Sequence, residues 1–248
     1  MVRILGVLTC LQRVAARPLH LNHHKCSVFT PIPSPFPGTS AVGRGVVHAM
    51  ILSDLDISTF VTSELREHRE AFEDTSKMIE APFRQALAIW ERSIRAGGKI
   101  LLFGNGGSAG DSQHLATELT IRYSKDRAPI AAIALTTDSS ALTACGNDFG
   151  FVHVFERQVE ALGRKGDVAF GITTSGNSDN VVLALQKARA MGLETIVLTG
   201  GTGGKVRDLA DVAIIVPSRI TARIQEMHIM IGQMLCGALE QRLGLVAP

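Results

Sequence analysis

Short apolar segments alternate with longer segments of helical periodicity from about residue 54 to the end of the chain. The apolar segments lie at 99–103, 130–135, 168–173, 195–198 and 212–216. Residues with helical spacing occupy 54–77, 82–96, 108–120, 138–146, 151–162, 178–191, 204–210 and 220–243. Strands that are apolar throughout and alternate with helices are typical of a parallel sheet covered on both faces. The pattern therefore predicts an α/β fold that binds its ligands beyond the carboxyl ends of the strands.

Residues 1–49 follow a different pattern. They contain five Lys and Arg residues and no Asp or Glu, and their prolines cluster at 31–37. This composition fits an organellar transit peptide, a flexible extension, or translated upstream sequence with Met50 as the working start. We expect 1–49 to be a disordered or loosely packed extension, and 50–248 to be a single domain that includes the helices at 54–96.

Composition excludes several classes of protein. The net charge is +2, but residues after 49 contain 20 basic and 23 acidic side chains, which offers no basic surface for nucleic acid. No apolar run approaches the ~18–20 residues that a membrane span needs. The four cysteines are scattered and form no metal-type spacing, as suits a reducing compartment. We expect a cytoplasmic protein that binds neither nucleic acid nor membrane.

A glycine-rich loop, Asn105-Gly106-Gly107-Ser108, follows the first predicted strand and leads into a helix. Glycines allow a tight turn, and the free N–H groups at a helix N-terminus attract anions. Farther along that helix, His114 and Glu118 are four residues apart and share one face. Such a pair is common on ordinary surfaces, but its position directly behind the loop favours a catalytic or metal-binding role.

The same loop also matches the loose dinucleotide fingerprint as Gly104-x-Gly106-x-x-Ala109. That fingerprint requires an acidic residue about 20 residues further on, at the end of the second strand. The first candidate after a strand is Asp138, which lies too far along the chain. A nicotinamide site is therefore disfavoured.

A second loop, residues 173–178, follows the strand at 168–173 and carries hydroxyls in the sequence Thr-Thr-Ser-Gly-Asn-Ser. A single hydroxyl suffices to cap a helix, so a cluster of this density favours a phosphate site. A third glycine-rich turn at 199–204 also follows a strand, and we interpret it only as a tight connection.

Several motifs, in this order and spacing, resemble the sugar isomerase (SIS) domain family, and within it the bacterial sedoheptulose 7-phosphate isomerases. They are GNGGS at 104–108, QHLATELTIRY at 113–123, GNDFGF at 146–151, GDVAFGITTSGNS at 166–178 and RIQEMHI at 223–229. The resemblance implies a five-stranded parallel sheet flanked by helices and a homotetramer with active sites at subunit interfaces. It also implies an isomerase that converts a phosphorylated seven-carbon sugar, sedoheptulose 7-phosphate, to D-glycero-D-manno-heptose 7-phosphate through an enediol, for heptose biosynthesis in carbohydrate metabolism.

The resemblance also implies roles for individual residues. Glu118 matches the catalytic base, and His114 matches a zinc ligand or proton donor. The zinc-binding positions of metal-containing members correspond to His114, Glu118 and Gln225. Substrate-binding positions correspond to Asn105, Gly106, Gly107, Ser108, Asn147, Asp148, Thr173, Thr174, Ser175, Ser178 and Gln225. Arg122 follows Glu118 by one helical turn, where it pairs with Glu118, contacts substrate, or is simply solvated.

One departure from the family concerns the last helix. The family has a histidine eight residues after the position of Gln225, and this chain has Gln233 there. An amide has no proton to exchange near neutral pH and is a weak zinc ligand. We therefore expect zinc to bind weakly or substoichiometrically. His228 points roughly 140° away from position 233 on an ideal helix, so we interpret it as a packing residue.

Two rival functions remain at this point. Some proteins of this fold lack the catalytic residues and act as adaptors, including one that binds the bacterial replication initiator, and these also lack the later histidine. An adaptor has no chemical need for a carboxylate at Glu118, which argues against this alternative. A related phosphosugar isomerase, or a protein that only binds a sugar phosphate, is the other alternative.

Overall fold

A computed structural model of the chain describes residues 55–247. Residues Leu55–Pro248 form one compact unit, whereas the predicted extension at 1–49 lies outside the described residues. Five strands form a single sheet in the order β2-β1-β3-β4-β5, and each neighbouring pair is parallel. The strands are β1 (Ile100–Gly104), β2 (Ala132–Ala134), β3 (Val168–Thr173), β4 (Glu194–Gly200) and β5 (Val212–Val216). The predicted α/β class, with a five-stranded parallel sheet, is confirmed.

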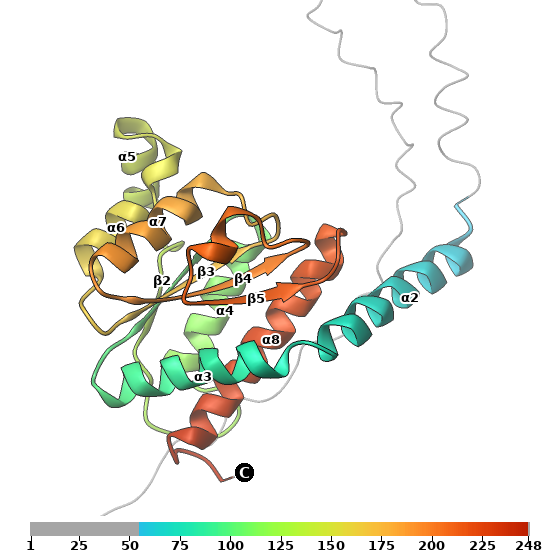
Figure 1. The fold of residues 1–248 in the computed structure, drawn as a ribbon, viewed down its shortest axis with the longest axis horizontal. Helices are drawn as coiled ribbons and strands as arrows, with labels where there is room; N and C mark the ends of the chain where they lie inside the picture. The colour runs from blue at the N-terminus through green and yellow to red at the C-terminus, as the bar shows by residue number, and fades with distance from the viewer. Residues whose placement is uncertain (1–54, 248) are drawn as a thin grey trace, which may run out of the picture. The chain divides into compact units, whose positions relative to one another are not determined.

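Helices cover both faces of the sheet (Figure 1). They are α2 (Ile57–Ser76), α3 (Glu80–Arg95), α4 (Gly107–Thr120), α5 (Ser139–Asp148), α6 (Glu156–Leu162), α7 (Asp179–Ala190) and α8 (Thr221–Arg242), with 3-10 turns η1 (Phe151–His153) and η2 (Gly204–Asp208). Side chains of a strand alternate between its two faces, and β1 shows the result. Ile100 and Leu102 pack with α3, α4 and α8, whereas Leu101 and Phe103 pack with α6 and α7.

Two helices differ from their predicted form. The helix expected at 151–162 is divided into η1 and α6, because the chain turns at the adjacent and buried Val154 and Phe155. The helix expected at 204–210 is the shorter turn η2. Gly203 and Gly204 begin it with φ of +91° and +56°, values that an α-helix does not allow.

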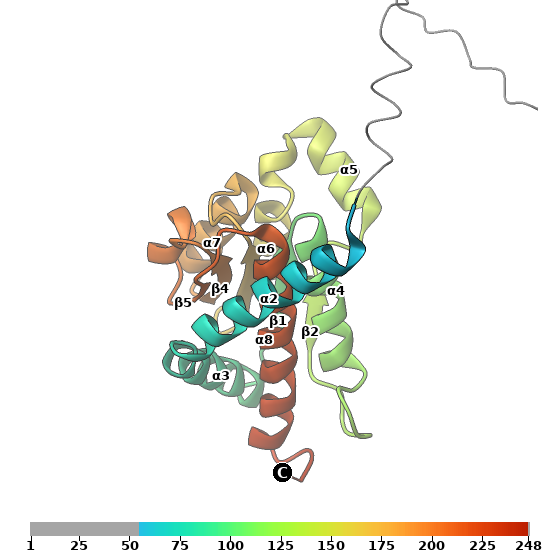
Figure 2. The ribbon, with the colours of Figure 1, turned by 90° about the vertical axis from the view of Figure 1, so that its right-hand side faces the viewer.

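Helix α2 packs only part of its surface within the chain. It lies across α8 (Figure 2), and its buried residues are Ala71 and Thr75. Its other apolar side chains are exposed, namely Ile57, Phe60, Val61, Leu65 and Phe72. An apolar surface of this kind is typical of a protein interface. None of the helices in the described part of the chain is long and apolar enough to cross a membrane.

Candidate active site

The two predicted substrate loops lie side by side, because β1 and β3 are neighbouring strands whose residues Gly104 and Ile172 are paired. Asn105 of the first loop and Asn180 of α7 exchange two hydrogen bonds, each 2.9 Å long, through their side-chain amides. This pair fixes the first loop to the helix that follows the second. Since both ends of the Asn105 amide are engaged there, the first loop presents mainly its backbone to a ligand.

Each glycine of the first loop is needed for a different structural reason. Gly106 adopts φ +54°, which L side chains rarely adopt. A Cβ on Gly107 would lie 2.4 Å from Nε2 of Gln225, so α8 approaches the start of α4 as closely as a glycine allows. Ser108 is buried in the first turn of α4, and its Cβ packs against Gly104. The tight turn predicted from the sequence is therefore present.

The second loop separates its four hydroxyls into two pairs. Thr173 Oγ1 is buried and lies 3.1 Å from Oγ of Ser178. Ser178 occupies the N-cap position of α7, but its side chain makes no capping hydrogen bond. The remaining pair, Thr174 and Ser175, lines a cavity. The loop is thus more than a helix cap, because the hydroxyl in the cap position serves another partner.

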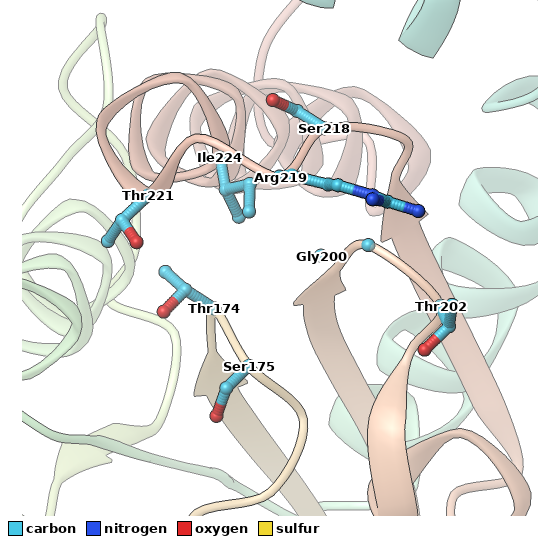
Figure 3. A pocket seen from close by; sticks show the side chains of 9 residues that line it. Thr174, Ser175, Gly200, Thr202, Ser218, Arg219, Thr221 and Ile224 are labelled. Atoms are coloured by element: carbon cyan, nitrogen blue, oxygen red, sulfur yellow. The ribbon is translucent and has the colours of Figure 1, made fainter.

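This cavity has a volume of about 390 Å³ and lies at the carboxyl ends of the central strands (Figure 3). Its lining combines Thr174 and Ser175 with residues at the end of β4, in the turn after it, and in the connection into α8 and its first turn, which are Gly200, Gly201, Thr202, Ser218, Arg219, Thr221 and Ile224. The sequence pattern did not identify these residues as part of a site. The turn at 199–204, predicted only as a tight connection, contributes part of the wall. Its position after a strand was the available signal.

His114, Glu118 and Gln233 form a cluster between α4 and α8. Nε2 of His114 lies 2.9 Å from Oε1 of Glu118 and 3.0 Å from Nε2 of Gln233. The amide of Gln233 also donates to Oε1 of Glu118 at 3.4 Å. The side chain of His114 is 52% exposed and that of Glu118 is 18% exposed, so the carboxylate is the more enclosed group. Position 233, where the family resemblance implies a histidine, thus faces His114 and Glu118.

Gln225 does not contact His114 or Glu118, because it lies near the start of α4. Helices α4 and α8 run in the same direction, since Gln225 contacts Gly107 and Gly232 contacts Leu115. Seven residues separate Gly107 from His114, which is about 10 Å along a helix. Within one chain, then, Gln233 rather than Gln225 takes the third place beside His114 and Glu118.

The ligands expected for zinc do not come together in one chain. Between residues 55 and 247, no group of three or more His, Cys, Asp and Glu side chains has a metal-binding arrangement. A zinc site needs at least three good ligands, and an amide is a poor one. His114 and Glu118 alone therefore do not fit a closed zinc site.

The comparisons with known proteins agree with this geometry. Residues 65–200 match the SIS domain family. The phosphoheptose isomerase of Paramagnetospirillum magneticum (strain AMB-1) is 54% identical over 186 residues, which cover 75% of this chain and 97% of that protein. That of Aliarcobacter butzleri is 49% identical over 183 residues, covering 74% and 97%. The chain belongs to the phosphoheptose isomerase family of SIS-domain proteins.

A solved structure from the same family has the same fold. The structure of phosphoheptose isomerase GmhA from Neisseria gonorrhoeae matches with a TM-score of 0.71 at 44% identity, over 75% of this chain and 99% of that one. The family consists of aldose–ketose phosphosugar isomerases, so the chain is an enzyme of this class. The alternative of an adaptor without catalytic activity is not favoured.

Other predicted positions of this family member lie apart from the two loops. Asn147 and Asp148 end α5 in exposed positions, where the amide of Asn147 donates to Oδ1 of Asp148 at 2.8 Å. Their contact with substrate stays a prediction. Arg122 is exposed and makes no ion pair with any residue in 55–247.

Two further side chains form hydrogen bonds with the backbone of residues at the site. Arg127, which the sequence analysis missed, is buried and pairs with Glu240 at 2.7 Å, while its Nη2 donates to the backbone oxygen of Glu118 at 2.6 Å. His228 is buried, and its Nε2–H donates to the backbone oxygen of Thr199 at 3.1 Å. Burial lowers the pKa of His228 to about 4. His228 is thus a neutral packing residue, as predicted.

Proposed function

We propose that this protein isomerises sedoheptulose 7-phosphate to D-glycero-D-manno-heptose 7-phosphate, and so supplies a heptose precursor. The observation that carries the proposal is the cluster on α4, where Glu118 is enclosed and in hydrogen-bond contact with His114 at 2.9 Å. Two relatives that share about half of their residues with this chain are named phosphoheptose isomerase, which supports the choice of substrate.

The reaction moves a proton between the first two carbons of the sugar. Glu118 would take the proton from C1 of the ketose while the C2 carbonyl oxygen gains a proton, which gives the enediol. The proton on the C1 hydroxyl then leaves and a proton is returned to C2, which gives the aldose. His114 is within hydrogen-bond reach of Glu118 and would exchange the proton at the oxygen atoms. The steps balance without an oxidant or a reductant.

The second loop would hold the phosphate at the far end of the sugar. The first turn of α7 offers backbone N–H groups, and the side chain of Ser178 leaves them uncapped. Thr174 and Ser175 add hydroxyl groups from the cavity wall. Binding energy from this remote group would orient the reacting carbons against the base.

We also propose that the active enzyme is a homotetramer in which a neighbouring chain completes each site. Glu118 lies eleven residues beyond Gly107, or about 16 Å along the axis of α4, whereas the phosphate loop lies beside the start of that helix. This separation favours a substrate that bridges the phosphate loop of one chain and Glu118 of another. The exposed apolar side chains of α2 would be covered in such an assembly.

Two further parts of the proposal concern metal and compartment. Zinc binding would be weak, since His114 and Glu118 are the two good ligands that the chain brings together. The scattered cysteines, of which Cys145 and Cys236 are free thiols, support a cytoplasmic location.

A direct assay tests the proposed function. The purified protein is incubated with sedoheptulose 7-phosphate, and formation of the aldose is followed by NMR with and without added zinc. Accumulation of D-glycero-D-manno-heptose 7-phosphate is the expected result. A folded protein that forms no aldose under either condition, at any substrate concentration, would refute the proposal.

A further inference from the structure

The cavity beside the phosphate loop contains a cationic side chain, Arg219, that the family resemblance does not assign. Its other lining residues are uncharged, and five of them carry hydroxyl groups. In Figure 3 the side chain of Arg219 extends past Gly200 toward the side of the cavity where Thr202 lies, and Thr174 and Ser175 lie on the opposite side. The cavity therefore has a net positive charge and many hydrogen-bond donors.

The backbone holds Arg219 beside the cavity. β5 ends at Val216 and α8 begins at Thr221, so Arg219 lies in a short connection between them. Within that connection, the backbone N–H of Ser218 donates to Val216 at 2.8 Å, and Oγ of Ser218 accepts from the N–H of Ile220 at 3.2 Å. These bonds fix the turn at both ends.

A glycine at the edge of the cavity allows α8 to pack closely against the end of β4. A Cβ on Gly200 would lie 2.5 Å from Cδ1 of Ile224, because the end of β4 packs directly against the first turn of α8. A side chain at this position would displace α8. The packing of β4 on α8 thus places the connection that carries Arg219 beside the end of β4.

Among the residues that the structure describes, Arg219 has no partner, whereas Lys205 and Arg223 do. Lys205 pairs with Asp179 at 3.2 Å, and Arg223 pairs with Glu226 at 2.7 Å. Arg219 forms no ion pair or hydrogen bond through its side chain with any residue in the described part of the chain. An unpaired guanidinium beside hydroxyls and a free helix N-terminus is the arrangement that binds a phosphate through two parallel hydrogen bonds.

We propose that Arg219 is a substrate-positioning residue that binds the phosphate group held by Thr174 and Ser175. The second loop has only neutral donors, so Arg219 supplies the fixed positive charge that distinguishes a dianionic phosphate from an uncharged sugar. This inference rests on the proposed function for the identity of the sugar, but not for the binding of phosphate itself.

The test compares Arg219→Gln with Arg219→Lys and with Arg207→Gln. Arg207 is an exposed arginine of η2 that does not line the cavity, so its substitution removes the same charge nearby. Calorimetric titration with inorganic phosphate needs no turnover. Arg219→Gln should weaken phosphate binding about tenfold or more, since a hydrogen bond to a charged group is lost. Arg219→Lys should recover part of the affinity, and Arg207→Gln should match the unmodified protein.

Kinetics with sedoheptulose 7-phosphate provide the second measurement. Arg219→Gln should raise KM by a similar factor and leave kcat within about twofold, as expected for a group remote from the reacting carbons. Added salt should reduce the affinity of the unmodified protein for phosphate more than that of Arg219→Gln. Equal phosphate affinity in Arg219→Gln and the unmodified protein would overturn the inference. If the unmodified protein showed no turnover while Arg219→Gln bound phosphate more weakly than the unmodified protein, the proposed function would be refuted and this inference would stand.

Discussion

Asn105 and Asn180 join the two loops of the site through a reciprocal pair of amide hydrogen bonds, each 2.9 Å long. The two residues are 75 positions apart, and Asn180 is only 4% exposed. Because each amide supplies both a donor and an acceptor, the pair fixes the distance between the glycine loop after β1 and the start of α7. The N-terminal ends of α4 and α7, which we predict to bind an anion, are thus held in one geometry before a ligand arrives.

Asn180→Ala should therefore weaken both the fold and phosphate binding. It removes two hydrogen bonds and leaves the Asn105 amide without its partner, which costs on the order of 1–3 kcal/mol in the free energy of unfolding. Denaturant unfolding measures this loss, and a thermal shift with inorganic phosphate measures the ligand effect. Gln113→Ala is the control, because it removes an exposed amide of α4 that bonds Thr136 instead. Equal behaviour of the two variants would contradict a role for the pair.

Glu118→Gln should abolish most of the turnover. The substitution keeps the size of the side chain and its hydrogen bonds with His114 and Gln233, but removes the base. A loss of roughly 100-fold or more in kcat is the expectation for removal of a general base. The melting temperature and oligomeric state should stay unchanged. Glu70→Gln, on the exposed part of α2, should isomerise normally. Near-normal turnover of Glu118→Gln would remove this residue from the mechanism.

Protonation of His228 should destabilise the protein in mild acid. Burial lowers the pKa of His228 from 6.5 to about 4 in the folded protein, so the unfolded chain takes up the proton first as the pH falls. The free energy of unfolding should therefore decrease between about pH 6.5 and pH 4, by about 3 kcal/mol in total from this group, and should be unaffected by it above pH 6.5.

His228→Gln isolates this contribution. A glutamine can still donate to the backbone oxygen of Thr199 but does not titrate. Denaturant unfolding at pH 7.5 and pH 4.5 should show a smaller loss of stability for His228→Gln than for the unmodified protein. Identical losses would mean that His228 does not control the acid sensitivity of the fold.

The strands were predictable because each is a short apolar run, and β1 and β3 are buried on both faces. The sequence pattern predicts β3 and β5 with the bounds that the structure has. The division of the helix expected at 151–162 was not predictable, since it depends on Val154 and Phe155 entering the core against α7. Local periodicity contains no information about that packing.

The candidate site, like the fold, has a part that the sequence predicts and a part that it does not. Glycines and hydroxyls at strand ends identify the two loops, because their chemistry is local. The partners that complete the site come from distant positions: Gln233 lies 119 residues after the histidine that it contacts. Arg219 and Ser175, which are 44 residues apart, line one cavity because β4 packs on α8. Spacing within a motif does not determine whether Gln225 or Gln233 faces His114 and Glu118.

Gln233 stands where the family resemblance implies a histidine, so we expect one substitution there to alter metal binding and turnover. Its amide lies 3.0 Å from Nε2 of His114 and 3.4 Å from Oε1 of Glu118, where a third zinc ligand would have to be. Neutral amides contribute little to zinc binding. We expect the purified protein to contain substoichiometric zinc and to isomerise slowly through Glu118.

Gln233→His should raise both zinc occupancy and turnover, because it places an imidazole beside the two good ligands already present. Gln233→Ala is the matched control, since it removes the amide without supplying a ligand, and it should leave zinc occupancy low. Elemental analysis and initial rates on the three proteins, each with and without added zinc, separate the effects on metal and on catalysis. Full zinc occupancy in the unmodified protein would show that a neighbouring chain supplies the missing ligand. If Gln233→His instead changed neither quantity, position 233 would have no part in the chemistry, and the contacts it makes with His114 and Glu118 would only hold α8 against α4.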